Sequence, residues 1–271
     1  MERILILGAS GFIGNALYKE LCSFFDTHGT YHTSNAAFEE NHQFHQYDIE
    51  TENIEILLQN LKPTVIISAV RGSFDAQIIA HFEIINYILT HNCKLLFISS
   101  VNVFDAFTNF PSYEYDKTLS QSIYGRFKIK VENALLRLPN DKYNILRLPM
   151  VFGHNSPRLK QIKALIDLGE AIEVFPNVVI NVTEIEKVTQ QVHYIINRKK
   201  QGVFHLGSTD LVHQKDFIEE VCEVLGHKNL VFKNIYNSNF DRFLAVLPKE
   251  NILPKNLQVS VRQVAKASVK Q

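Results

Sequence analysis

The chain has 271 residues, of which 46% are hydrophobic, and its 28 lysine and arginine residues balance 28 aspartate and glutamate residues. This length is enough for one large α/β domain, or for a main domain with a smaller lobe. The neutral charge balance excludes a strongly basic surface, so we expect neither a nucleic-acid partner nor a membrane partner.

The cysteines and histidines give no sign of a cross-linked or metal-bound protein. Cys22, Cys93 and Cys222 are far apart and form no C-x-x-C pair, which excludes a disulfide framework and a zinc knuckle. The eleven histidines include no H-E-x-x-H motif, so we expect no metal site. The apolar run before Gly8 is too short for a signal peptide, and no apolar stretch is long enough to span a membrane. We therefore expect a cytoplasmic protein.

A glycine-rich stretch follows the first apolar run, Ile4 to Leu7, which is typical of a short buried parallel strand. The apolar residues after the glycines have helical spacing, so the glycines lie at a strand-to-helix turn. Such a turn points the first N–H groups of the helix at a space where a diphosphate fits. We predict a dinucleotide site made by Gly8, Ser10, Gly11, Phe12, Ile13 and Gly14. The alternative is a glycine turn without a ligand.

Further apolar runs alternate with helical patterns along the first 150 residues. We expect strands at 29–34, 43–48, 64–70, 94–100 and 143–148, and helices from about 50, over 75–91 and from 124. This alternation predicts an α/β fold with a doubly wound parallel sheet of the Rossmann type. The segment 109–120 has loop composition.

After residue 150 the alternation loosens, and short strands are expected at 172–174, 178–180, 203–206 and 231–235, with helices at about 158–168, 184–198 and 214–226. We therefore predict a dinucleotide-binding domain over 1–150 and a smaller α/β substrate lobe over 151–271. The helix at 184–198 is a candidate to return to the main domain.

The ends of the predicted strands supply further cofactor contacts, because ligands of open parallel sheets bind at the carboxyl ends of the strands. His32 and Thr33 stand where an acid would hold the adenosine ribose of NAD, so NADP(H) is favoured over NAD(H). Asp48 and Ile49 are candidates for the adenine pocket, although Asp48 is equally suited to cap the next helix. The remaining expected contacts are Ala69, Val70 and Ser99.

A tyrosine and a lysine are spaced for proton transfer on one helix. Tyr124 and Lys128 are four residues apart and lie on the same helix face. A free phenol has a pKa of about 10, and a neighbouring cation favours its ionised form, which brings it toward the working range. Ser100, at a strand end, is a candidate to hold the same carbonyl oxygen. A second Y-x-x-x-K, from Tyr113 to Lys117, lacks an apolar helical stripe, so we predict Ser100, Tyr124 and Lys128 as the catalytic residues. The alternatives are a surface aromatic, a solvated charge and a strand-end cap.

Taken together, these residues resemble the extended short-chain dehydrogenase/reductase family, and within it the dTDP-4-dehydrorhamnose reductase branch. The likeness rests on the stretches GASGFIG at 8–14, Asp48-Ile49, FISSVNVFD at 97–105, YGRFK at 124–128, LRLPMVFG at 146–153 and GVFHLG at 202–207. The resemblance implies NAD(P)H over the glycine turn, a nucleotide-sugar between the lobes and catalysis by Ser100, Tyr124 and Lys128. It also implies that Lys128 binds the nicotinamide ribose.

The chain departs from that branch in the predicted sugar pocket. Ser100-Val101-Asn102 replaces Thr-Asp-Tyr, and Met150 replaces a tryptophan. We therefore expect Asn102 and Met150 to face a sugar that differs from the rhamnose precursor. Arg71 and Arg158 are candidates for the substrate diphosphate, with surface ion pairs as the alternative. Arg242 is not included in the predicted site.

These observations predict an NAD(P)H-dependent reductase of a nucleotide-linked keto-sugar, in which Tyr124 supplies the proton. Two other functions remain open. One is a non-catalytic, dinucleotide-binding regulatory subunit that resembles the one of methionine adenosyltransferase. The other is a nucleotide-sugar epimerase. A homodimer is also left open.

Overall fold

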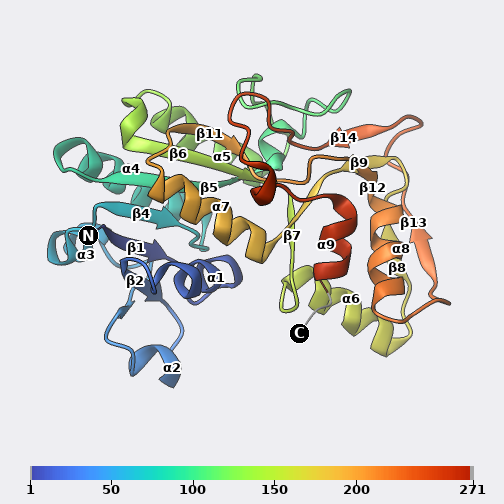
Figure 1. Cartoon of the computed structure of the whole chain (residues 1–271), viewed down its shortest axis with the longest axis horizontal. Helices are drawn as coiled ribbons and strands as arrows, with labels where there is room; N and C mark the ends of the chain where they lie inside the picture. The colour runs from blue at the N-terminus through green and yellow to red at the C-terminus, as the bar shows by residue number, and fades with distance from the viewer. Residues whose placement is uncertain (1, 269–271) are drawn as a thin grey trace. The chain divides into compact units, whose positions relative to one another are not determined.

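The computed structural model describes residues 2–268, which form two compact units (Figure 1). Within the described residues, the first unit comprises 2–99, Ser122–Leu146 and Val192–Val203, and the second comprises Ser100–Gln121, Arg147–Gln191 and 204–268. The chain therefore crosses between the units several times.

A seven-stranded sheet has the order β11-β6-β5-β4-β1-β2-β3. Its strands are β1 (Arg3–Leu7), β2 (Asp26–Tyr31), β3 (Phe44–Gln46), β4 (Val65–Ser68), β5 (Lys94–Ser100), β6 (Tyr143–Leu148) and β11 (Gly202–His205). Neighbouring strands are parallel across the sheet from β3 through β2, β1 and β4 to β5. The strand order reverses direction between β1 and β4, which is the switch point where doubly wound sheets bind ligands. The predicted doubly wound parallel sheet is confirmed.

The helices of the first unit pack on both faces of this sheet. They are α1 (Phe12–Leu21), α3 (Ile54–Leu61), α4 (Phe74–Thr90) and α5 (Ile123–Leu135), whereas the short α2 (Ala36–Glu39) follows β2 without burying a residue. Leu5 and Leu7 share a core with α3, α4 and α5, and the intervening Ile4 and Ile6 are also fully buried. Because successive side chains of a strand alternate between faces, Ile4 and Ile6 face the other side, where α1 packs on β1 and β2.

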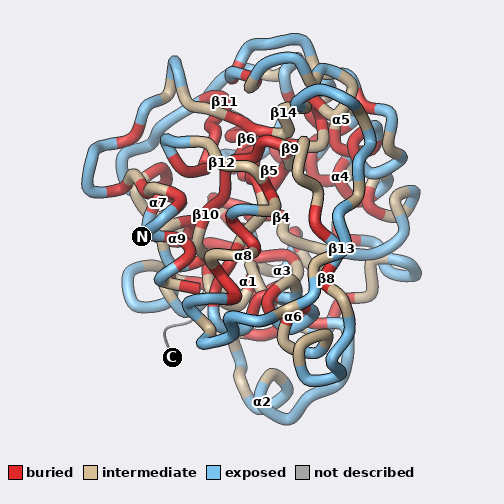
Figure 2. Tube along the Cα trace, turned by 90° about the vertical axis from the view of Figure 1, so that its right-hand side faces the viewer, coloured by how far each residue is buried: buried red, intermediate tan, exposed pale blue. Residues whose placement is uncertain are grey.

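Serine side chains cap the first turns of α4 and α5. Ser73 caps α4 by accepting a hydrogen bond from the Ala76 N–H, and Ser122 caps α5 by accepting one from the Gly125 N–H. Most residues in the strands of the sheet are buried, whereas none of the four residues of α2 is buried (Figure 2).

The second unit contains small sheets and three helices around its own apolar core. Its elements are β7 (Met150–Phe152), α6 (Pro157–Leu168), β8 (Ile172–Val174), β9 (Val178–Ile180), β10 (Val182–Glu184), β12 (Val212–His213), α8 (Gln214–Val224), β13 (Phe232–Asn234), β14 (Arg242–Leu244) and α9 (Val261–Ala267). The strands pair as β10-β7, β12-β9-β14 and β13-β8. The long helix α7 (Ile185–Asn197) begins in the second unit and ends in the first.

The division of the chain differs from the boundary at residue 150 that we drew from the sequence. Residues 100–121 belong to the second unit, where the Ser112 N–H bonds to the Ala245 carbonyl and the Phe243 N–H bonds to the Thr108 carbonyl. The buried Glu114 carboxylate also accepts backbone hydrogen bonds from residues 249–251. These bonds span more than 120 positions, so no local pattern predicts them. Residues 192–203, which include the end of α7, belong to the first unit.

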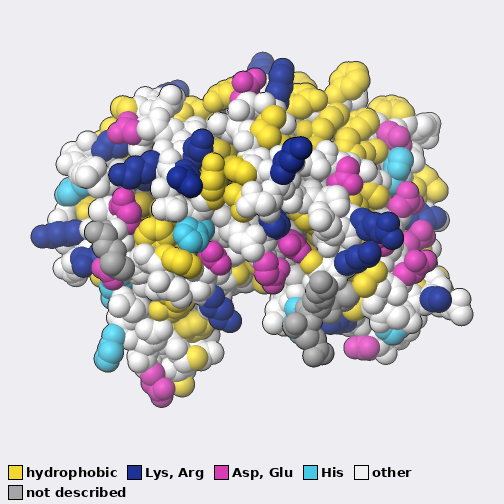
Figure 3. Space-filling model, viewed as in Figure 1, with side chains coloured by type: hydrophobic (Ala, Val, Ile, Leu, Met, Phe, Trp, Pro, Cys, Tyr) yellow, Lys and Arg dark blue, Asp and Glu magenta, His cyan; other side chains and the backbone are white. Residues whose placement is uncertain are grey.

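One face of the molecule (Figure 3) agrees with the neutral composition. On the face shown in Figure 3, basic and acidic side chains are interspersed. Among the described residues, none of the helices is both long and apolar enough to cross a bilayer.

Candidate functional site

The glycine turn connects β1 to α1 and has little room for side chains. Gly8 has a left-handed φ of 78°, and a Cβ at this position would lie 2.8 Å from the carbonyl oxygen of Ala69. The Gly8 N–H donates to Thr30 Oγ1 at 2.9 Å, and the Gly11 N–H donates to the Gly8 carbonyl at 3.0 Å. Gly11 is the N-cap of α1 and, having no side chain, leaves the first helical N–H groups without a side-chain cap. The turn therefore presents bare backbone N–H groups, which suit an anion.

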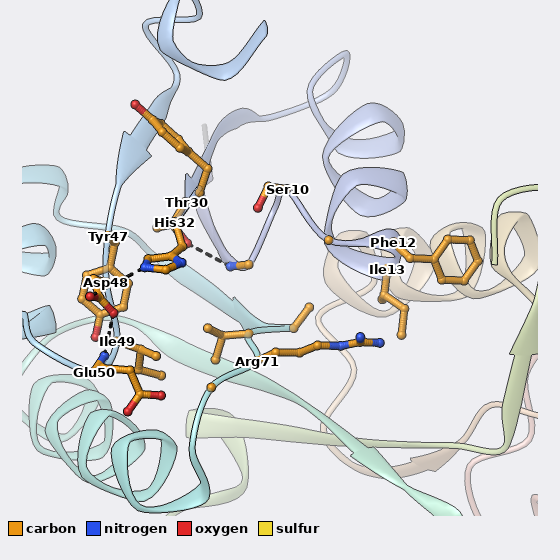
Figure 4. Close-up of a pocket in the computed structure, with 16 residues that line it drawn as sticks. Ser10, Phe12, Ile13, Thr30, His32, Tyr47, Asp48, Ile49, Glu50 and Arg71 are labelled. Atoms are coloured by element: carbon orange, nitrogen blue, oxygen red, sulfur yellow. Dashed lines mark hydrogen bonds and ion pairs between the residues drawn. The ribbon is translucent and has the colours of Figure 1, made fainter. Parts of the chain in front are cut away.

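A cavity of about 310 Å³ opens above this turn, in the first unit (Figure 4). We call it the first cavity. It is lined by Gly8, Ser10, Gly11, Phe12, Ile13, Thr30, Tyr31, His32, Tyr47, Asp48, Ile49, Glu50, Ala69, Val70, Arg71 and Gly72. The structure thus brings together most of the residues predicted for the cofactor, with the carboxyl ends of β1, β2, β3 and β4 around them.

Six predicted residues have other positions: in the described structure the first cavity is not lined by Gly14, Thr33, Ser99, Tyr124 or Lys128, and it is lined by Arg71. Gly14 lies beneath the turn, where a Cβ would be 2.2 Å from the Gly8 carbonyl oxygen, so its role is close packing. Arg71, predicted for the substrate diphosphate, lines the first cavity instead of the second one described below.

His32 and Asp48 form an ion pair at the rim of the first cavity. His32 Nε2 lies 3.6 Å from Asp48 Oδ2, and Asp48 Oδ1 also accepts the Glu50 N–H at 2.9 Å (Figure 4). This backbone hydrogen bond has the largest effect in lowering the pKa of Asp48, and a hydrogen bond from the Thr51 hydroxyl has the next largest. Asp48 therefore caps the turn that follows it and also faces the cavity. The helix itself begins later than expected, at Ile54 with Asn53 as its N-cap.

Sequence reasoning missed Glu50, which lines the same cavity. Its carboxylate accepts the Ser73 N–H at 2.6 Å and the Ser73 hydroxyl at 2.8 Å, which connects the loop after β3 to the start of α4. Its position beside Asp48-Ile49 was the only signal available in the sequence.

Tyr124 and Lys128 lie on one face of α5, as their spacing predicted, but their environments differ. The Tyr124 side chain is 39% exposed, whereas Lys128 is 7% exposed. Lys128 Nζ donates to the Ile98 carbonyl at 2.8 Å and lies 5.6 Å from the Tyr124 ring centroid. Burial lowers the pKa of Lys128 to about 7, and the Glu132 carboxylate opposes this shift. Lys128 is therefore a buried amine beside an accessible phenol, which excludes the alternative of a solvated charge.

The two serines at the end of β5 belong to different units. Ser99 is buried in the first unit, and its hydroxyl donates to Glu132 Oε1. Ser100 belongs to the second unit, where its hydroxyl accepts the Asn102 N–H at 3.2 Å and donates to Asn102 Oδ1 at 3.0 Å. Ser100 thus caps the 3-10 helix Val101–Phe104, as the alternative interpretation had it, and it also lines a cavity.

That second cavity, of about 440 Å³, lies within the second unit. It is lined by Ser100, Val101, Asn102, Asp105, Thr108, Pro149, Met150, Arg158, Phe175, Val178, Ile180, Asn181, Gln214, Asn237, Arg242 and Leu244. Predicted substrate residues Asn102, Met150 and Arg158 are all among these. Arg242, which sequence reasoning left out, is there as well.

The strand register explains how Arg242 reaches the second cavity. Arg242 of β14 pairs with Val178 of β9, and Leu244 pairs with Ile180, so these four side chains share one face of the sheet. Arg242 Nε lies 3.4 Å from Thr108 Oγ1. The cavity therefore combines an apolar wall with two guanidinium groups, an arrangement that suits a ligand with both ring and phosphate groups.

The described residues contain no cluster of three or more histidine, cysteine, aspartate or glutamate side chains placed to hold a metal ion. Cys22 is exposed, and Cys93 and Cys222 are buried; all three are free.

With this geometry in place, comparison with known families identifies the chain. The profile of the family described as RmlD substrate binding domain matches residues 1–254. The chain belongs to this family. The resemblance to the reductase branch of the extended short-chain dehydrogenases is thereby confirmed.

Two kinds of relative share sequence with this RmlD-family chain. A probable low-salt glycan biosynthesis reductase of Haloferax volcanii is 23% identical over 265 residues, which cover 88% of this chain and 85% of the relative. The beta subunit of methionine adenosyltransferase 2 from Mus musculus is 29% identical over 166 residues, which cover 56% of this chain and 48% of that protein.

Solved structures share the fold over nearly the whole length of this chain. A dTDP-4-dehydrorhamnose reductase of Clostridium acetobutylicum has a TM-score of 0.77 at 19% identity and covers 98% of each chain. The corresponding enzyme of Bacillus anthracis, solved with NADP, has a TM-score of 0.76 at 21% identity, covering 98% of this chain and 97% of that one.

Proposed function

We propose that this RmlD-family protein is an NAD(P)H-dependent reductase of a nucleotide-linked keto-sugar. The observation that carries the proposal is the pairing of an accessible phenol, Tyr124, with a buried amine, Lys128, in the unit that also holds the glycine turn and the first cavity. A phenol beside a buried amine is suited to proton transfer, which a simple binding protein does not need. The relatives of the chain, which include a probable glycan biosynthesis reductase and dTDP-4-dehydrorhamnose reductases, support the same class.

The first cavity fits a dinucleotide. Its floor is formed by Gly8 and Gly11, where a Cβ would come close to backbone atoms. The first N–H groups of α1 have no side-chain cap. The diphosphate would bind at Ser10, Gly11, Phe12 and Ile13. The adenosine would lie near His32, Asp48 and Ile49, and the rest of the dinucleotide would pass Ala69 and Val70. When bound, the nicotinamide supplies the hydride.

Tyr124 would act as the proton donor to the carbonyl oxygen of the sugar. Its Oη–H donates a hydrogen bond to that oxygen and delivers the proton as the carbonyl carbon becomes tetrahedral. Lys128 stabilises the resulting phenolate with its charge and, by the family resemblance, binds the nicotinamide ribose. The Ser100 hydroxyl would hold the same carbonyl oxygen with a second hydrogen bond.

The second cavity would receive the nucleotide-sugar. Arg158 and Arg242 are suited to the diphosphate because a guanidinium group donates two parallel hydrogen bonds to phosphate oxygens. Asn102 and Met150 would face the sugar, and their difference from the usual residues of the branch favours a sugar other than the rhamnose precursor. His32, rather than an acid, at the end of β2 favours NADPH over NADH.

The decisive experiment follows NADPH oxidation with a panel of keto-sugar nucleotides. Replacing Tyr124 with Phe should lower kcat by roughly 10²-fold or more, because the proton donor is lost, while NADPH binding is retained. Tyr113→Phe, which alters the second Y-x-x-x-K copy in the loop of the second unit, is the matched control and should leave kcat unchanged. Equal activity of Tyr124→Phe and the unsubstituted protein would refute the proposed role of Tyr124.

A regulatory subunit is the second candidate, because the beta subunit of methionine adenosyltransferase 2 is 29% identical over 56% of this chain. A protein that binds NADPH but turns over no member of the panel would favour this function. The fold does not discriminate against an epimerase, since an epimerase of Bacillus cereus solved with NAD has a TM-score of 0.76. Net consumption of NADPH distinguishes a reductase from an epimerase.

A further inference from the structure

Behind Tyr124, two oppositely charged side chains are buried on α5. Lys128 and Glu132 are one helical turn apart, and they are 7% and 1% exposed. Lys128 Nζ donates to the Ile98 carbonyl at 2.8 Å, and Glu132 Oε1 accepts a hydrogen bond from the hydroxyl of Ser99. Because Ile98 and Ser99 are consecutive, the two hydrogen bonds fasten the same turn of α5 to the end of β5.

Aromatic rings surround the Lys128 amine on several sides. Its Nζ lies 4.5 Å from the Phe97 ring centroid, 5.0 Å from that of Phe127 and 5.6 Å from that of Tyr124. Ring faces attract a cation only moderately, whereas removing an ammonium group from water costs several kcal/mol. The rings and one carbonyl therefore do not by themselves keep this amine charged.

Besides Tyr124 and Glu132 of its own helix, the amine interacts with a titratable group of α4, His81. Its Nδ1–H donates to the Gln77 carbonyl, and its Nε2 accepts from the Ser68 hydroxyl at 2.8 Å. Burial, with a smaller contribution from the Lys128 charge, lowers the pKa of His81 to about 4, so the imidazole is neutral near pH 7. The negative charge of Glu132, in contrast, opposes the effect of burial on Lys128.

We propose that Glu132, oriented by Ser99, is a positioning residue that keeps the Lys128 amine protonated and fixed on the Ile98 carbonyl. Glu132 lies a helical turn further along α5 than Lys128 and acts on the reaction only through it. The proposal rests on the proposed function, because it assigns the charged amine its use beside Tyr124. The competing explanation is that Glu132 and Ser99 only hold α5 on β5.

The two explanations predict different pH behaviour. Glu132 raises the pKa of Lys128 against the effect of burial, so a neutral residue at 132 lets Lys128 lose its proton at a lower pH. Steps that need the ammonium then fail first at high pH. A purely structural role predicts a uniform loss at all pH values.

The experiment compares Glu132→Gln with the unsubstituted protein between pH 5.5 and 9.5. Three quantities are followed: kcat/KM, the Kd for NADPH, and the titration of Lys128 by NMR of lysine labelled with ¹³C. The last needs neither substrate nor cofactor. We expect all three transitions of Glu132→Gln to move to lower pH by about one unit or more, so that the loss at pH 8 exceeds the loss at pH 6 by about 5-fold or more.

Matched variants separate charge from packing. Glu132→Asp retains the carboxylate, so its transitions should lie between those of Glu132→Gln and those of the unsubstituted protein. Ser99→Ala should move the transitions to lower pH by less than Glu132→Gln does. Lys130→Gln changes a charge on an exposed position of the same helix and should leave the pH profile unchanged. Should Glu132→Gln fail to fold, Ser99→Ala and Glu132→Asp decide the question through the same titrations.

The inference is overturned if Lys128 titrates in Glu132→Gln as it does in the unsubstituted protein. If Glu132→Gln does not fold, the same result in Ser99→Ala overturns it. Failure of the proposed function has a different appearance. In that case no keto-sugar nucleotide is turned over, while the shift in the NMR titration persists.

Discussion

Gly14 lies directly against Gly8, so that a Cβ on Gly14 would be 2.2 Å from the Gly8 carbonyl oxygen and 2.9 Å from the Ala9 Cα. These neighbours are backbone atoms, which cannot move aside as a flexible side chain can. The close approach therefore sets the position of α1 under the turn, and with it the direction of the N–H groups that face the first cavity.

Gly14→Ala should push α1 away from the turn. We expect a loss of roughly 1–3 kcal/mol in the free energy of unfolding and at least about 10-fold weaker NADPH binding, measured by urea unfolding and by fluorescence. Gly169→Ala is the control: it has a left-handed φ of 67° with nothing within 4 Å, so it should cost some stability and leave NADPH binding intact. Normal NADPH binding by Gly14→Ala would show that the turn tolerates the shift.

His32 should influence which phosphate state of the cofactor binds. His32→Asp places a second carboxylate beside Asp48, where it accepts ribose hydroxyls and repels a 2′-phosphate. We expect the ratio of NADH to NADPH affinity to rise about 10-fold or more, measured by titration of each cofactor. His42→Ala, at an exposed position after α2, should leave the ratio unchanged. An unchanged ratio in His32→Asp would place the adenosine ribose elsewhere.

Arg242 should bind the phosphates of the sugar nucleotide. Replacing Arg242 or Arg158 with Met removes a charge-assisted hydrogen-bond donor and should weaken the binding of uridine or thymidine diphosphate by about 10-fold or more, measured by calorimetry. NADPH binding, which depends on the first cavity, should remain as it was. Arg262→Met, at an exposed position of α9, is the charge-matched control. Diphosphate binding that survives in both cavity variants would exclude the second cavity as the phosphate site.

Acid should destabilise the protein through two buried histidines. Burial lowers the pKa of His81 to about 4 and that of His205 to about 3, against 6.5 in the unfolded chain. Between pH 6.5 and these values the unfolded state binds protons that the folded state does not, so stability present above pH 6.5 is lost as the pH falls. Each histidine should contribute a slope of roughly 1.4 kcal/mol per pH unit in urea unfolding at intermediate pH.

The two sites can be tested separately. His81→Gln and His205→Gln should each reduce that slope by roughly 1.4 kcal/mol per pH unit, which corresponds to one proton, whatever they do to the absolute stability. His154→Asn, at an exposed position, should leave the slope as it is. A slope unaffected by either buried variant would contradict the assigned neutral state of these imidazoles.

The parallel sheet and the first cavity could be predicted because their signals are local. Apolar runs such as Ile4–Leu7 are uniform in strands buried on both faces, and the glycine spacing reports directly on a strand-to-helix turn. The carboxyl ends of parallel strands meet at one edge, so residues as distant as Gly8, Asp48 and Val70 could be assigned to one site.

What only the tertiary structure decided concerns environment and long-range register. The sequence by itself determined the spacing of Tyr124 and Lys128, but not that one is accessible and the other buried on the Ile98 carbonyl. It likewise could not place residues 100–121 with the second unit, or Arg242 in the second cavity, since both depend on β14 pairing with segments far away in the chain. Local periodicity records which face of an element is apolar, whereas burial of a charge depends on which other elements cover that face, and that is settled only when the whole chain has packed.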